Sequence, residues 1–96
     1  MLKFWQRDGE GQALSKSMRT ILATERGLKD EAAASLLMVE QKGHYSGRKV
    51  TFFRVFAPDT VKAAGIKLCH FDNLDAACIL HSGHTEADGQ IVLNRN

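Results

Sequence analysis

The chain has little cysteine: Cys69 and Cys78 are its only two in 96 residues, with one proline and one tryptophan. Two cysteines exclude the disulfide framework that staples many small secreted proteins. No stretch approaches the roughly 18 apolar residues of a membrane span. Residues 1–8 also lack the apolar core of a signal peptide. We therefore expect a cytoplasmic protein with reduced thiols and no membrane association.

Neither sign of charge is in large excess, since the formal net charge is only +2. With 44% apolar and 25% charged residues, the composition is that of a globular protein and not of a disordered chain. A chain of this length buries roughly 60–65% of its unfolded surface. We expect one domain spanning 1–96, stabilised by a single core, with no metal and no cofactor.

A first helix is expected at 12–26, after a short irregular lead at 1–11. The apolar residues of this segment recur in steps of four, three and one: Leu14, Met18, Ile21 and Leu22. That spacing is typical of an amphipathic helix with one buried face. Gly27 suits the left-handed position that ends many helices.

A second helix is expected at 30–42, so that a helical pair occupies 12–43. Asp30 and Glu31 favour a first turn through the helix dipole, and three alanines follow. Gly43 can end this helix. A loop at 44–47 then leads into the sheet.

The main strand is expected at 48–57, where β-branched and aromatic residues dominate. Because both of its faces are largely apolar, this strand should be central. Pro58 and Asp59 would end it, and a short helix at 60–64 would separate it from a strand at 66–71. The short connection favours antiparallel neighbours.

Two further strands are expected at 78–84 and 90–94. Asp88-Gly89 between them is a strong hairpin signal. The predicted fold class is therefore α+β, with two N-terminal helices packed on a small sheet of three to four strands. The sheet is mainly antiparallel, with the short helix at 60–64 between strands.

A cluster of soft ligands in the last third of the chain suggests a metal or thiol site, and its members are Cys69, His70, Cys78, His81 and His84. On a regular strand His81 and His84 point to opposite faces, and Cys78 lies roughly 20 Å from His84 at about 3.3 Å per residue. Both cysteines sit among apolar residues without a catalytic signature. We predict no metal and no catalytic residues, and keep Cys78, His81 and His84 as the weakest candidates.

The acids of this last third offer a carboxylate pair, Glu86 and Asp88. Both fall in the predicted turn, where acids cap the backbone and face water. General acid–base catalysis needs a shielded pocket. We therefore expect a protein that is not an enzyme.

The segment 42–67 is basic, whereas 68–90 contains acids and no Lys or Arg. Basic residues beside aromatic ones on a sheet suit single-stranded nucleic acid. Phe52 and Phe53, however, must point to opposite faces, so at least one belongs to the core. The candidate nucleic-acid-binding residues are Lys42, Arg48, Lys49, Arg54, Lys62 and Lys67.

Protein interaction is the function that the sequence favours. Phe4 and Trp5 lie outside the expected elements and are candidate contact residues. The strand at 90–94 would sit at a sheet edge, open to the addition of a partner strand. The basic and acidic segments would also allow two copies to pair. We predict a non-enzymatic interaction module, with self-association as one form of it and nucleic-acid binding as the alternative.

Overall fold

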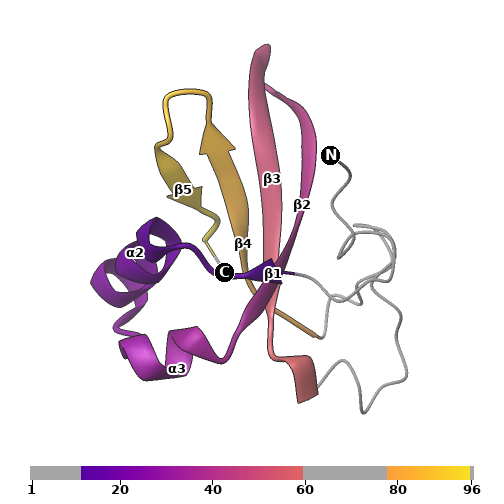
Figure 1. The fold of residues 1–96 in the computed structure, drawn as a ribbon. Helices are drawn as coiled ribbons and strands as arrows, with labels where there is room; N and C mark the ends of the chain where they lie inside the picture. Colours follow the sequence, from indigo (N-terminus) through magenta and orange to yellow (C-terminus); the bar gives the residue numbers. More distant parts are fainter. Residues whose placement is uncertain (1–11, 60–77, 96) are drawn as a thin grey trace.

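The structure, a computed structural model, describes residues 12–59 and 78–95. Within these residues five strands form one open antiparallel sheet in the order β1-β2-β3-β4-β5, accompanied by two helices (Figure 1). The elements are β1 (Gln12–Ala13), α2 (Lys16–Arg26), α3 (Asp30–Ala34), β2 (Leu37–Tyr45), β3 (Arg48–Phe56), β4 (Ile79–Glu86) and β5 (Ile91–Leu93). The expected mixed α+β class and antiparallel sheet are confirmed, but the described sheet has five strands and not three or four.

Helix α2 begins later than its apolar pattern suggested. The side chain of Ser15 caps it by accepting a hydrogen bond from the Met18 backbone N–H at 3.1 Å. Gly27 ends it in the left-handed conformation, with φ of 67°, as predicted. The expected helical residues Gln12 and Ala13 instead form β1, which pairs with the start of β2.

The predicted second helix at 30–42 is wrong beyond its first turns. Helix α3 ends at Ala34, and β2 begins at Leu37. A short apolar run at 36–39 fits a buried strand as well as a helix. Pairing with β3 along the full length of β2 decides between the two, because tertiary contacts override local propensity. Residues 44 and 45, expected in a loop, complete β2.

The β2–β3 hairpin forms the longest paired part of the sheet. Its register runs without a break from Leu37 opposite Phe56 to Tyr45 opposite Arg48. Ser46 and Gly47 close it with φ values of 51° and 78°, and a two-residue loop with two positive φ angles matches the twist of the strands. Strand β3 is third of five in the sheet, which confirms the predicted central position.

The β4–β5 hairpin is also confirmed, with β4 extending to Glu86 and the loop shortened accordingly. The backbone N–H of Gly89 donates to the Glu86 carbonyl at 2.9 Å, which closes the turn. The expected short helix at 60–64, the strand at 66–71 and the lead at 1–11 lie outside the described residues.

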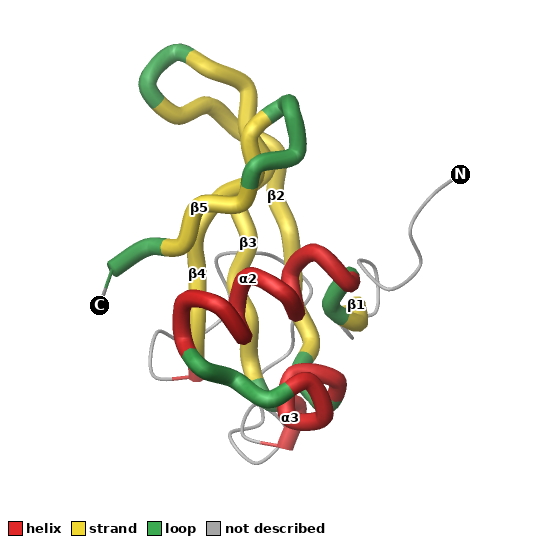
Figure 2. The backbone as a smooth tube through the Cα atoms, turned by 90° about the vertical axis from the view of Figure 1, so that its left-hand side faces the viewer, coloured by secondary structure: helices red, strands yellow, loops and turns green. Residues whose placement is uncertain are grey.

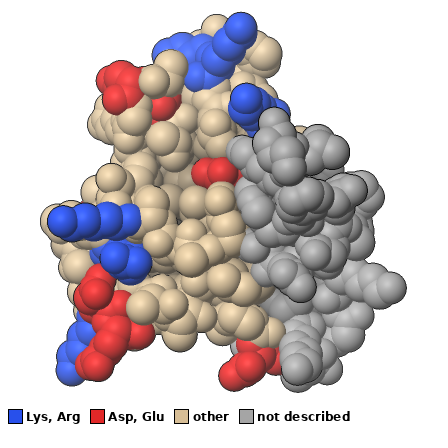
Figure 3. Space-filling model, in the orientation of Figure 1, with Lys and Arg blue, Asp and Glu red and all other residues tan. Residues whose placement is uncertain are grey.

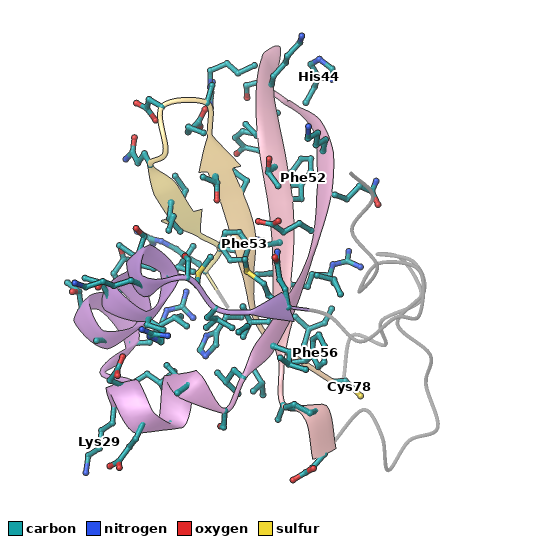
Figure 4. All side chains as sticks on the ribbon, in the orientation of Figure 1. Lys29, His44, Phe52, Phe53, Phe56 and Cys78 are labelled. Carbon is teal, nitrogen blue, oxygen red and sulfur yellow. The ribbon has the colours of Figure 1, made fainter. Side chains whose placement is uncertain are left out.

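Both helices cover one face of the sheet, here called the helix face (Figure 2). The opposite side, which neither of these two helices covers, is called the open face. Phe53 points to the helix face and Phe52 and Phe56 point to the other side (Figure 4), as the alternation of β3 requires. The main core cluster joins α2 and the residues that flank the two helices to the sheet. Its buried residues are Leu14, Met18, Leu22, Leu36, Met38, Phe53 and Val55. A smaller cluster of Val39, Phe56 and Cys78 is buried separately.

Candidate functional site

Strand β5 lies at one end of the sheet and has no strand on its outer side among the described residues. The Glu86 N–H donates to the Gln90 carbonyl and the Asn94 N–H to the Ser82 carbonyl, each at 2.8 Å. Because pairing alternates along an antiparallel strand, the backbone groups of Ile91 and Leu93 point away from β4. This is the position that the sequence predicted for the strand at 90–94.

A groove runs beside this edge, between β5 and α2. It is a hollow of about 360 Å³. Its lining residues are Lys16, Ser17, Thr20 and Ile21 from α2, with Gly89 and Ile91 from the second hairpin. Ile21 and Ile91 are half-buried and also pack against the main core. The groove therefore combines a hydrophobic wall with the exposed ammonium group of Lys16.

Arg26 at the end of α2 fastens β5 to the helix. Its Nη2 donates to the backbone carbonyl of Asn94 at 2.5 Å. Its Nη1 lies 3.5 Å from Nδ1 of His81 on β4. Burial, and secondarily the charge of Arg26, lowers the pKa of His81 below 6.5. The edge strand is thus held at its C-terminal end, and no strand of the described residues covers the outer side of Ile91 and Leu93.

A polar cluster of different chemistry occupies the open face, and the sequence did not reveal it. Arg48 donates from Nε and Nη2 to the two carboxylate oxygens of Glu86, at 3.0 and 2.9 Å. Nε2 of His84 lies 3.0 Å from Oε2 of the same carboxylate. The His84 ring is buried and stacks on Tyr45 at 4.7 Å between centroids, with the edge of Phe52 at 6.3 Å.

The hydrogen bonds from Arg48 hold the pKa of Glu86 at about 2, well below 4.5, with a smaller contribution from His84. The same pairing raises the pKa of Arg48 above its ordinary value. Glu86 is therefore an ionised partner in a fixed pair and not the turn residue that the sequence suggested. Asp88 does behave as expected, because its Oδ1 accepts from the Gln90 N–H at 3.0 Å.

The cluster is better suited to structure than to catalysis. A histidine and a carboxylate within hydrogen-bonding distance could activate a nucleophile. The hydroxyl of Ser82, however, accepts from Nδ2 of Asn94 at 3.0 Å, and Cys78 is buried in the separate small core. Both carboxylate oxygens of Glu86 already accept hydrogen bonds from Arg48. The stacked rings and the hydrogen-bonded pair hold together the end of β2, the start of β3 and the end of β4.

The three weak metal candidates lie in three different surroundings. Cys78 packs with Val39 and Phe56, His81 faces α2 through Arg26, and His84 belongs to the cluster on the open face. This separation agrees with the opposed faces predicted for the two histidines. Over residues 12–59 and 78–95, no three His, Cys, Asp or Glu side chains are grouped as metal ligands would be. Cys69 lies outside those residues.

Of the six basic candidates, four are described, and they divide between the two faces. By the register, Arg48 and Arg54 belong to the open face, whereas Lys42 and Lys49 belong to the helix face. Arg48 is paired with Glu86, so part of the charge separation in the sequence is neutralised within one molecule. Lys62 and Lys67, like the interaction candidates Phe4 and Trp5, lie outside the described residues.

Lys42 and Lys49 line a larger hollow, of about 590 Å³. It opens between the tips of the two hairpins. Figure 3 shows basic side chains over the tip of the β2–β3 hairpin and acidic ones over the neighbouring β4–β5 tip. The sequence signal for this site was the basic segment itself, but only the register shows which of its residues meet.

A scan of family models, a search of curated proteins and a search of solved structures each found no significant match. None of the described helices has the length and apolar character needed to cross a lipid bilayer.

Proposed function

We propose that this protein is a non-enzymatic interaction module that binds an extended segment of a partner protein along the outer edge of β5. The observation that carries the proposal is the open edge itself. The outward backbone groups of Ile91 and Leu93 have no hydrogen-bond partner among the described residues. An extended segment can satisfy such groups by adding a strand to the sheet.

The groove beside β5 would give this interaction its side-chain preference. In an added strand, alternate side chains point toward the helix side of the sheet. There they would meet the hydrophobic wall of Ile21 and Ile91. An acidic residue nearby would meet Lys16, which is exposed and has no ion-pair partner among the described residues. We expect the preferred segment to alternate apolar residues and to carry a carboxylate.

The short length of β5 sets the strength of binding. Only two residues of a three-residue strand present outward groups, and each new hydrogen bond contributes about 0.5–1.5 kcal/mol. The hydrophobic contact in the groove must supply much of the remaining affinity. We therefore expect micromolar or weaker, rapidly reversible binding and not a permanent complex.

A library of random peptides, displayed and selected on the intact protein, tests the proposal. Enriched peptides should have the alternating apolar pattern and lose at least about tenfold in affinity with Ile91→Pro, which removes an outward N–H. Val92→Thr is the matched control. Val92 faces the open face of the sheet, and threonine keeps a β-branched side chain there.

Lys16→Glu provides a second variant that should not disturb folding. Lys16 is the first residue of α2, where an acidic side chain is favourable to the helix dipole. Acidic peptides should bind this variant more weakly. Failure to enrich any peptide would overturn the proposal. Equal binding to the wild type, Ile91→Pro and Lys16→Glu would also overturn it.

Self-association is the form of this interaction in which the partner is a second copy. Sedimentation at several protein concentrations measures it directly. A reversible dimer that Ile91→Pro abolishes would place the second copy at the β5 edge. A dimer that this variant leaves intact would show that two copies meet elsewhere.

A further inference from the structure

The hollow between the two hairpin tips is lined by different side chains from the groove beside β5. Its side chains on the helix face come from β2, β3 and β4: Lys42, His44, Lys49, Thr51 and Thr85. Of these, His44 lies at the tip of the β2–β3 hairpin (Figure 4), directly opposite Lys49 in the register. No residue lines both this hollow and the groove beside β5.

The positive charge of this hollow is not neutralised by the described residues. Lys42 and Lys49 are exposed, and neither side chain has a hydrogen bond or ion pair among the interactions found in 12–59 and 78–95. Glu86 also lines the hollow, but its carboxylate is held by Arg48 and His84. Glu40, the nearest acid along β2, accepts a hydrogen bond from Gln12 at 2.7 Å.

The hollow offers hydrogen-bond donors in addition to its positive charge. Thr51 and Thr85 are directly opposite each other in the β3–β4 register and are half-buried. Their hydroxyl groups can donate, and the two ammonium groups can only donate. A ligand rich in acceptor oxygens and carrying negative charge is the chemical complement of this set, and phosphate groups have both properties.

The phenylalanine and tyrosine rings nearby do not belong to this surface. Tyr45 and Phe52 contact His84 on the open face, so they cannot stack on bases held by Lys42 and Lys49. We propose that the hollow binds phosphate groups through these two lysines, with the threonine hydroxyls as further donors, and that it does not read nucleobases. The ligand would be a nucleic-acid strand or another chain of phosphates.

Two polyanions of similar charge test whether phosphate alone is recognised: an oligothymidylate, which carries bases, and inorganic polyphosphate, which carries none. Binding of each to the intact chain is measured over a range of salt concentrations. We expect both to bind, with affinity that falls as salt rises. The double variant Lys42→Gln, Lys49→Gln should weaken both by about tenfold or more. It should also reduce the salt slope for the oligonucleotide by about 1.4, since each single-strand phosphate contact contributes about 0.7.

The matched control is Lys29→Gln with Arg95→Gln, which removes the same charge from exposed residues outside the hollow. Equal binding by the double variant and this control would overturn the site. Strong binding of the oligonucleotide with none of polyphosphate would overturn recognition by phosphate alone. All four substituted residues are exposed, so we expect every variant to fold. Thermal unfolding curves that match the wild type check this. The hollow and the groove beside β5 share no lining residue, so failure here does not decide the β5 proposal.

Discussion

Arg48, the first residue of β3, donates two hydrogen bonds to Glu86, the last residue of β4. The pair connects the basic and acidic segments of the sequence across one sheet. It also fastens the β3 end of the first hairpin to the β4 end of the second, next to the stacked rings of Tyr45 and His84.

Glu86→Gln should lower stability at neutral pH and change the response to acid. The folded carboxyl has a pKa of about 2, compared with an ordinary 4.5. A depressed pKa stabilises the fold above pH 4.5, and this contribution is lost as the pH falls from 4.5 toward 2. The difference in unfolding free energy between wild type and variant should therefore narrow over that interval. Urea unfolding at several pH values measures it, with Glu25→Gln on the exposed side of α2 as the control.

Arg26→Met should raise the pKa of His81. Burial is the larger cause of its lowered pKa and the charge of Arg26 the smaller one, so the variant should recover only part of the shift. Since the folded state takes up the proton less readily, stability is present above pH 6.5 and falls as the pH drops below it. The His81 ring resonances, followed by NMR over this range, report the pKa. An unchanged titration in Arg26→Met, or an equal change in Arg19→Gln, would contradict the assigned contact.

Phe53→Ala should strongly destabilise the fold. Phe53 is 1% exposed and belongs to the main core, and such truncations cost about 3–5 kcal/mol. Phe52→Ala is the matched control on the neighbouring residue, which is half-buried on the open face. Denaturant unfolding should give a much lower free energy of unfolding for Phe53→Ala than for Phe52→Ala. Equal losses of unfolding free energy would contradict the assignment of faces.

Gly83→Ala should destabilise the β4–β5 hairpin. A Cβ at this position would collide with the Val92 carbonyl oxygen and lie 3.0 Å from the Phe53 ring. Forced overpacking of this kind costs about 1–3 kcal/mol. Gly43→Ala meets only the ring of Phe52, which can turn away, so its cost should be smaller. Thermal unfolding of the two variants checks the order.

Local signals predicted the parts of this fold that local structure decides. Gly27 marked the end of α2, and Asp88-Gly89 marked the second hairpin. The segment at 36–39 could not be assigned in the same way, because four apolar residues suit a strand and a helix equally. Its state depends on β3, with which it pairs. Ser46-Gly47 was the available sign, since a two-residue turn of this kind implies a strand on each side.

The candidate sites depended on register even more strongly. The sequence placed Lys42, Arg48 and Lys49 in one basic segment, but a difference of one residue along β3 sends Arg48 and Lys49 to opposite faces. His84 and Glu86 share a face because they are two residues apart. Their partner Arg48 lies far away in the sequence, and only the β3–β4 pairing brings it to them.

The two hairpins differ in how much chain must be ordered before they can form. The strands of the first are joined by Ser46 and Gly47 alone, so their pairing requires closure of a very short loop and can begin within about 1–10 μs. Pairing of β3 with β4 must instead close the chain between Phe56 and Ile79, with a larger loss of loop entropy. Folding should then start at the first hairpin. Changes in β4 and β5 should mainly accelerate unfolding, whereas changes near the turn of the first hairpin should slow folding.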